Sequence, residues 1–118
     1  MVDQPSEQEA AERRRHERVD IELPVTIRYK GRLIPATALN LSCGGMMLDA
    51  DSPAVQEGGR VEVVVDLSAL ERDVSLRGEI VRREFSGSKT RIGIRFTNLF
   101  TMGHDAVVRY LRRHGLGH

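Results

Sequence analysis

The clearest pattern in the chain is an alternation of apolar and polar residues that begins shortly after the N-terminus. Apolar side chains occupy every second position from Val19 to Tyr29. Because successive side chains of a β-strand point to opposite faces, this spacing predicts a strand with one buried face. Pro24 falls between the apolar positions. Proline cannot donate a ladder hydrogen bond, so it indicates a sheet edge or a bulge at this point.

A second strand is predicted over residues 32–42, after a turn signal at residues 30–31. Strict alternation would divide its side chains between two faces. One face would carry Leu33, Leu39 and Leu41, and the other Ile34, Ala36, Ala38, Asn40 and Ser42.

Four further strands are predicted over residues 46–48, 60–67, 74–85 and 91–96, with a glycine-containing hairpin loop between the last two. Six strands with short connections and no crossover helices favour an antiparallel sheet that closes into a small barrel or a sandwich. The predicted fold class is therefore all-β, with one exception at the C-terminal end.

The C-terminal segment has the periodicity of a helix. Residues 102–114 place apolar side chains three and four positions apart, and arginines gather late, where they oppose the negative end of a helix dipole. Gly115 then ends the predicted helix. The apolar positions are Met102, Ala106, Val107, Tyr110 and Leu111.

The N-terminal segment, residues 1–12, has too few apolar side chains to pack on a core and is expected to be a flexible arm. The 118 residues have room for one domain. No apolar run approaches the roughly 20 residues of a membrane-spanning helix, and the charged N-terminus does not resemble a secretory signal. Since the single Cys43 cannot form an intrachain disulfide, the cytoplasm is the expected compartment, without membrane insertion.

Arginines are concentrated just before the first strand. Residues 13–18 hold four arginines in six positions, although the net charge of the chain is only +1. This small net charge argues against a general binder of polyanions. A guanidinium can stack on a base, pair with a guanine edge or hold a phosphate, so the cluster is a candidate binding element. The alternative is a solvated charge run balanced by Glu12 and Glu17.

A second candidate element covers residues 40–45, with the sequence Asn-Leu-Ser-Cys-Gly-Gly. In a strand, Asn40 and Ser42 would lie on one face with Leu41 opposite. The glycines that follow would leave backbone N–H groups open to an anion or a nucleobase. The alternative is a polar hairpin turn. Cys43 is interpreted as a small turn residue rather than a reactive thiol.

Catalytic and metal sites find little support in the sequence. It contains no recognisable Ser-His-Asp arrangement, zinc-type spacing or phosphate-binding loop, so we expect no enzyme activity, no metal and no cofactor. His114 and His118 are four positions apart, but the glycines between them make a poor metal site. His16 and His104 are isolated and are expected to be exposed polar residues.

Two motifs occur together, in order and one predicted hairpin apart. Residues 14–18 match R-x-x-x-R, and residues 40–45 match [D/N]-x-S-x-x-G. The pair resembles the PilZ domain family of bacterial receptors for cyclic di-GMP, and residues 91–96 look like the late Gly-x-x-Phe strand of that family. The resemblance implies a domain over residues 13–115 after the arm. It also implies a six-stranded antiparallel barrel with a C-terminal helix.

The resemblance also implies roles for single residues. Arg14 and Arg18 would hold guanine edges and phosphates of cyclic di-GMP, and Arg13 would serve a second ligand molecule stacked on the first. From the barrel side, short polar side chains would hydrogen-bond a guanine and a glycine would keep the wall of the site low. These barrel residues are Asn40, Ser42 and Gly45.

The sequence therefore predicts a single-domain cyclic di-GMP receptor that passes its signal to an unidentified protein partner by moving the N-terminal arm. One alternative is a PilZ-like adaptor that does not bind nucleotide. Another is a small barrel that binds single-stranded nucleic acid. Such proteins use stacking aromatic side chains, and this chain has only three phenylalanines and two tyrosines, so no nucleic-acid partner is expected.

Overall fold

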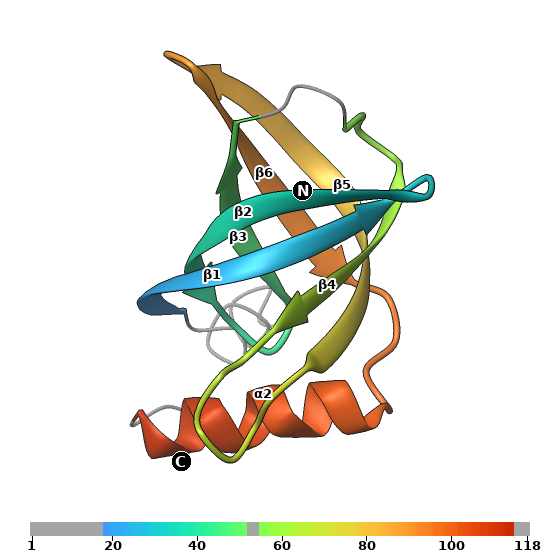
Figure 1. The fold of residues 1–118 in the computed structure, drawn as a ribbon. Coiled ribbons are helices and arrows are strands. Elements are labelled where there is room, and N and C mark those ends of the chain that lie inside the picture. The colour runs from blue at the N-terminus through green and yellow to red at the C-terminus, as the bar shows by residue number, and fades with distance from the viewer. Residues whose placement is uncertain (1–17, 52–54, 115–118) are drawn as a thin grey trace, which may run out of the picture.

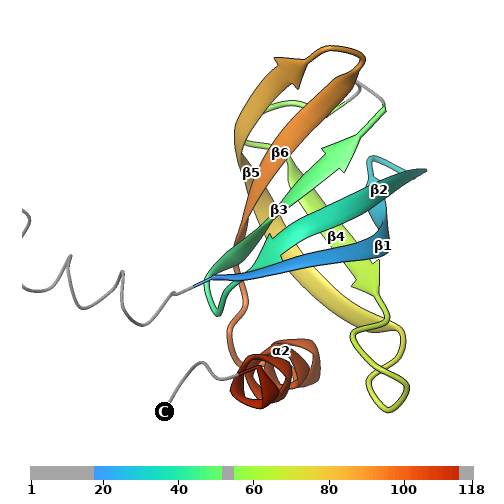
Figure 2. The same ribbon diagram turned by 90° about the vertical axis from the view of Figure 1, so that its left-hand side faces the viewer.

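Six antiparallel strands close into a barrel and one helix lies across an end of it (Figure 1 and Figure 2). The computed structural model describes residues 18–51 and 55–114. Closure confirms the six-stranded antiparallel barrel with a C-terminal helix and excludes a sandwich. The elements are β1 (Val19–Tyr29), β2 (Arg32–Leu41), β3 (Gly45–Ala50), β4 (Arg60–Val65), β5 (Val74–Ser86), β6 (Lys89–Phe96) and α2 (Met102–Arg113).

The order of the strands around the barrel brings the start of β3 next to β6. Neighbouring strands follow the order β1-β2-β3-β6-β5-β4, and β4 pairs with β1 to close the barrel. In the pairing of β3 with β6, Gly45 lies opposite Arg95 and Met47 lies opposite Gly93. The end of the predicted 40–45 motif therefore lies beside a strand that is far away in the sequence.

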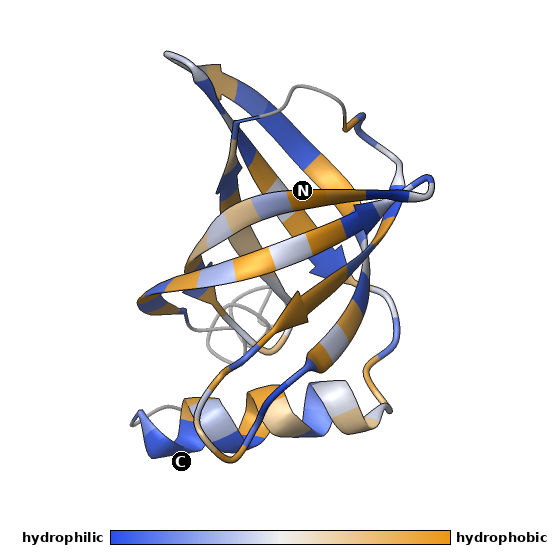
Figure 3. Cartoon of the chain, viewed as in Figure 1, coloured by the Kyte–Doolittle hydropathy of each residue, from blue (hydrophilic) through white to orange (hydrophobic). Residues whose placement is uncertain are grey.

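Hydrophobic and hydrophilic residues alternate along the strands (Figure 3), and the buried aliphatic side chains form the core of the barrel. Ile27 and Leu48 are fully buried. Removing such a side chain from water stabilises a fold by about 1.5–3 kcal/mol. The prediction for β1 is confirmed, because its odd-numbered residues are the more buried ones. Pro24 is exposed and follows a register shift between Asp20 and Leu23, in agreement with the predicted bulge.

The predicted faces of β2 are wrong near its end, because the strand contains a β-bulge. Ala38 pairs with Leu48 of β3, but Asn40 pairs with the neighbouring Met47, so β2 holds one extra residue. The inward face changes from even to odd numbers across the bulge, and Leu41 is fully buried. Asn40 consequently points to the outside of the barrel, where it is half-buried.

Helix α2 begins after the N-cap Thr101, whose hydroxyl accepts a hydrogen bond of 3.1 Å from the backbone N–H of His104. It packs so closely on β5 that a Cβ at Gly103 would lie 2.0 Å from the carbonyl oxygen of Ser75. The prediction of Met102 on the apolar face is wrong: the helix approaches the barrel through Gly103 and His104, and Met102 is 87% exposed. No helix within residues 18–51 and 55–114 is long and apolar enough to cross a membrane.

Candidate ligand-binding site

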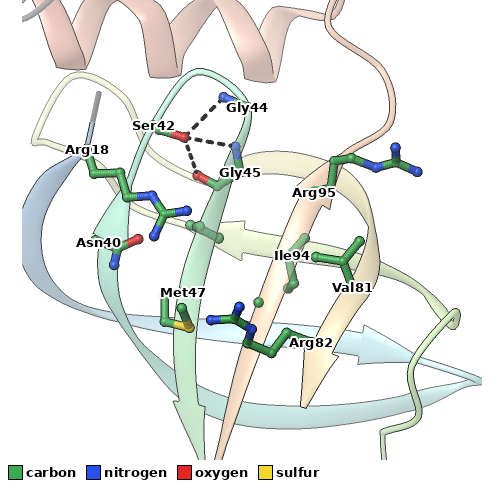
Figure 4. A pocket seen from close by; sticks show the side chains of 12 residues that line it. Arg18, Asn40, Ser42, Gly44, Gly45, Met47, Val81, Arg82, Ile94 and Arg95 are labelled. Atoms are coloured by element: carbon green, nitrogen blue, oxygen red, sulfur yellow. Dashed lines mark hydrogen bonds between the residues drawn. The ribbon is translucent and has the colours of Figure 1, made fainter. Parts of the chain in front are cut away.

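An open pocket of about 490 Å³ lies on the outside of the barrel, where the β2–β3 turn meets β6 and β5 (Figure 4). Four predicted site residues line it: Arg18, Asn40, Ser42 and Gly45. Arg13 and Arg14 lie outside the described residues. The rest of the lining comes from the turn and from β3, β5 and β6: Gly44, Met46, Met47, Val81, Arg82, Gly93, Ile94 and Arg95.

Ser42 shapes the turn between β2 and β3. Its hydroxyl oxygen accepts hydrogen bonds of 3.2 Å from the backbone N–H groups of Gly44 and Gly45, and it donates one of 3.3 Å to the Gly45 carbonyl (Figure 4). The prediction that these glycine N–H groups are open is therefore wrong. A hydroxyl has one donor and two acceptor lone pairs, so Ser42 has no hydrogen-bonding capacity left in this arrangement.

Gly45 has no room for a side chain. A Cβ at this position would lie 2.1 Å from the carbonyl oxygen of Ile94 on β6. The positive-φ glycines of the described residues do not include Gly45, so the close approach of two backbones, and not an unusual conformation, requires glycine here. Glycine was predicted at this position to leave space for a ligand. The packing of β3 against β6 requires glycine here in any case.

Arg18 and Asn40 project from one side of the pocket. Figure 4 shows the Arg18 side chain above that of Asn40, with the guanidinium directed into the pocket. The ladder between β1 and β2 pairs Asp20 with Asn40, which holds the start of β1 at this position. A planar cation beside an amide can bind a phosphate or the hydrogen-bonding edge of a nucleobase.

Two further arginines, which the motifs did not indicate, line the pocket from β5 and β6. Arg82 follows a register shift in β5 that begins at Ile80, a bulge that residue alternation does not reveal. Figure 4 shows Arg18 and Arg82 directed toward the middle of the pocket from two sides. Arg95 points away from it, and its Nη2 donates a hydrogen bond of 2.5 Å to Oε1 of Glu79.

The lining of the pocket has positive charge. Its described residues include three arginines, of which Arg18 and Arg82 point into the pocket, and no carboxylate. The acidic partners of two of them, Glu84 for Arg82 with 3.6 Å between Nε and Oε1 and Glu79 for Arg95, lie outside the lining. Cations that converge on one hollow raise the local concentration of anions, so the pocket favours an anionic ligand.

His104 joins helix α2 to the β2–β3 turn, and the prediction that it is exposed is wrong. Its Nε2 lies 2.7 Å from the carbonyl oxygen of Cys43 and donates to it as N–H. Its ring meets Phe96 edge to face, with 6.2 Å between centroids. Histidine can bury its carbon atoms once a ring nitrogen finds an acceptor. Its position three residues before the buried Val107 was the sequence signal that could have indicated this.

The Cys43 thiol has no sign of activation. Burial raises its pKa, and this effect outweighs the charge of Arg112, which lowers the pKa. The thiol therefore stays protonated near neutral pH and is a poor nucleophile. Among residues 18–51 and 55–114, no three His, Cys, Asp or Glu side chains gather as a potential metal site.

The fold and the site define a small antiparallel barrel with an open, arginine-lined pocket beside a Ser-Cys-Gly-Gly turn. The chain belongs to the PilZ domain family, whose family model matches residues 12–113. PilZ domains are non-catalytic receptors for cyclic di-GMP, which confirms that the chain is not an enzyme. No curated protein matches the chain in sequence.

Solved structures share the fold at low sequence identity. The inhibitor of motility MotI/DgrA from Bacillus subtilis has a TM-score of 0.72 and 22% identity, over 86% of this chain and 50% of that one. The PilZ domain of YcgR from Escherichia coli with c-di-GMP has a TM-score of 0.65 and 22% identity, over 86% and 90%. PlzA from Borreliella burgdorferi in complex with c-di-GMP has a TM-score of 0.54 and 9% identity, over 91% and 55%. The chain thus spans about half the length of MotI/DgrA, and the likeness shows the fold.

Proposed function

We propose that this chain is a cytoplasmic receptor that binds cyclic di-GMP in the pocket between Arg18 and Arg82 and signals to a protein partner. The observation that carries the proposal is that Arg18 and Arg82 point into one open pocket beside Asn40, and that the described residues of its lining include no carboxylate. A cytoplasmic location is part of it, because PilZ proteins are typically cytoplasmic.

Cyclic di-GMP is a dianion with two guanine bases, and the pocket offers groups complementary to both parts. The guanidinium of Arg18 can pair with the O6/N7 edge of guanine or hold a phosphate. The amide of Asn40 can donate to and accept from the same base. Arg82 supplies a second cation from β5. The volume of about 490 Å³ falls within the range of small-molecule pockets, about 300–1,000 Å³.

The remaining motif residues have supporting or additional roles in this proposal. Ser42 and Gly45 hold the turn against β6, so that the pocket keeps its shape. Arg14 would hold the ligand from the N-terminal side, and Arg13 would serve a second stacked molecule. The likeness to the barrels of YcgR and PlzA, which were solved with c-di-GMP, supports the choice of ligand.

Signalling is proposed to follow from closure of the N-terminal arm. Without ligand, the like charges of the arginines in residues 13–18 repel one another, and Arg18 lines the same pocket as the cationic Arg82. Two phosphates placed among these groups would reverse that repulsion and favour closure despite the cost of ordering the chain. The closed arm, together with the exposed face of α2, would then present a new surface to the partner.

Single-stranded nucleic acid is the weaker candidate. Proteins that bind it generally use aromatic side chains as stacking platforms. The described residues that line the pocket include no aromatic side chain.

Calorimetric titration of the full chain tests the proposal, first with cyclic di-GMP and then with a short single-stranded oligonucleotide. We expect saturable binding of cyclic di-GMP and no comparable binding of the oligonucleotide. Equal affinity for both would favour the nucleic-acid alternative, and binding of neither would favour an adaptor without a nucleotide ligand.

A further inference from the structure

A second hollow, of about 680 Å³, lies on the outside of the barrel across β1, β4, β5 and the end of β6. Figure 1 shows that β1, β4 and β5 lie side by side. We call this region the outer hollow. We call the pocket between Arg18 and Arg82 the nucleotide pocket. The outer hollow is separate from it except for Arg95, which lines both. Its lining consists of Arg28, Arg60, Val61, Glu62, Arg77, Gly78, Glu79, Arg95, Thr97 and Asn98.

The charged residues of the outer hollow follow the register of the strands. Residues directly opposite one another on neighbouring strands form two rows, and each row has one glutamate between two arginines. The rows are Arg28, Glu62 and Arg77 across β1, β4 and β5, and Arg60, Glu79 and Arg95 across β4, β5 and β6. Each row therefore carries one surplus positive charge.

Each glutamate is already held by one of its two arginines. Nη1 of Arg28 lies 3.3 Å from Oε1 of Glu62, and Nη2 of Arg95 lies 2.5 Å from Oε1 of Glu79. Glu62 also accepts a hydrogen bond from the hydroxyl of Ser75. Each glutamate is thus paired with one arginine of its row, which leaves one arginine in each row without an ion pair among the described residues.

The third members, Arg60 and Arg77, make no ion pair within residues 18–51 and 55–114. They occupy diagonal positions on β4 and β5, which places residues about 7–8 Å apart. The two glutamate side chains are 29% and 33% exposed, and their arginine partners 61% and 64%. The acids thus lie deeper than the cations, so the surface that a partner meets is positive.

The mixture of charges favours a protein partner over a nucleic acid. The evenly spaced phosphates of a nucleic acid would be repelled by the glutamates as well as attracted by the arginines. A protein segment can carry carboxylates only at the positions that lie opposite arginines. Alternate side chains of an extended segment lie on one face about 6–7 Å apart, close to the diagonal spacing of Arg60 and Arg77. Leu99 and Phe100 follow the outer hollow in the chain, and Phe100 is 96% exposed. Aromatic side chains and arginines are both enriched at protein interfaces.

We propose that the outer hollow docks an extended acidic segment of a protein partner, with two carboxylates two positions apart that pair with Arg60 and Arg77. Docking at this surface does not depend on cyclic di-GMP, because neither arginine lines the nucleotide pocket.

The test is a nuclear magnetic resonance titration of the isotope-labelled full chain with the blocked peptide Ser-Glu-Ser-Glu-Ser. We expect saturable shifts of the backbone amide signals around residues 60–62, 77–79 and 97–98. The same peptide with glutamine in place of glutamate should cause none. Arg60→Gln and Arg77→Gln should each weaken binding about fivefold, the upper range for an exposed ion pair.

Arg32→Gln is the matched control, because Arg32 is an exposed arginine of β2 outside the outer hollow, and this variant should bind the peptide like the wild type. The double variant Arg60→Glu/Arg77→Glu should instead bind a peptide with lysine at both acidic positions. Shifts that persist with the glutamine peptide, or equal affinity in Arg60→Gln and Arg32→Gln, would overturn the proposal. Tighter binding of a short single-stranded oligonucleotide at these same amides would also overturn it.

Discussion

The residues of the two sequence motifs differ in what their side chains do. Ser42 is 5% exposed and directs its hydroxyl to the backbone of its own turn. Gly45 lies against the backbone of β6, where no side chain fits. Arg18 is exposed and Asn40 is half-buried, and both line the open pocket. The 40–45 motif therefore combines a residue whose side chain faces the open pocket, Asn40, with two residues that keep the turn in place, Ser42 and Gly45.

Arg18→Ala should weaken binding of cyclic di-GMP by about 1.5–3 kcal/mol, the range for hydrogen bonds to charged groups. Its thermal unfolding should match the wild type, because Arg18 is exposed and precedes the first strand. Arg32→Ala, which removes an arginine outside the pocket, is the control for net charge. Calorimetric titration of the wild type, Arg18→Ala and Arg32→Ala with cyclic di-GMP measures the three affinities. Wild-type affinity in Arg18→Ala would show that Arg18 is not part of the site.

Ser42→Ala should lower the free energy of unfolding by about 1 kcal/mol, because two partly buried N–H groups lose their acceptor. Asn40→Ala should leave stability nearly unchanged and weaken ligand binding directly, since the Asn40 side chain lies on the outer face of the barrel. Chemical denaturation and ligand titration of both variants separate the two roles. The distinction fails if Asn40→Ala destabilises the fold as much as Ser42→Ala does.

The spacing of the two motifs predicted that Arg18, Asn40, Ser42 and Gly45 belong to one site, and the structure places these four residues around one pocket. The sequence could not indicate Arg82, whose place in the pocket depends on a bulge in β5 and on the pairing of that strand with β6. Residues that are brought together only by the register between two strands share no short sequence motif.

Among the elements, helix α2 is tied to the binding turn through His104. The hydrogen bond of 2.7 Å from its Nε2 to the Cys43 carbonyl spans the gap between the helix and the β2–β3 turn. Strand and helix periodicity predicted both elements. Their contact was not predicted: the position of His104 three residues before Val107 indicates the buried face of the helix, but helix periodicity does not identify an acceptor on a turn that is distant in the sequence.

His104→Ala should lower the free energy of unfolding by about 1–3 kcal/mol, because the Cys43 carbonyl loses its buried donor. It should also weaken cyclic di-GMP binding, since the turn is then held less firmly. His104→Gln, which keeps a side-chain N–H donor, should recover part of both losses. Thermal unfolding and calorimetry measure the two effects. Equal defects in the two variants would show that the hydrogen bond itself does not matter.

A second contact of α2 predicts a pH effect. Hydrogen bonds of 2.7 and 3.2 Å from Arg109 lower the pKa of Glu71 below its usual value of 4.5. A carboxylate with a lowered pKa in the folded state adds stability above its unfolded pKa, and this stability is lost as the pH falls through the folded pKa. Urea unfolding between about pH 6 and pH 3 should therefore show a smaller loss of stability in Glu71→Gln than in the wild type. Parallel curves would contradict the role of this ion pair.

At the scale of the whole molecule, closure of the barrel is what assembles the site. The number of strands and the terminal helix followed from alternation and spacing, whereas alternation alone left a barrel and a sandwich equally open. The pairing of β3 with β6 then brings the 40–45 turn to Arg82 and Arg95. The change of inward face in β2 could not be read from a strict period of two, because one inserted residue reverses it.

Hydrogen exchange on the free and the ligand-bound chain tests the central claim most directly, because it reports local opening segment by segment. If cyclic di-GMP binds in the pocket and closes the arm, exchange should slow around residues 13–18 and 40–45 when the ligand is added. Strand β4, which does not line the pocket, serves as the internal control and should exchange at the same rate in both states. Unchanged exchange at residues 40–45 under saturating cyclic di-GMP would contradict the proposed site, and slowed exchange there with an unchanged arm would contradict the proposed switch.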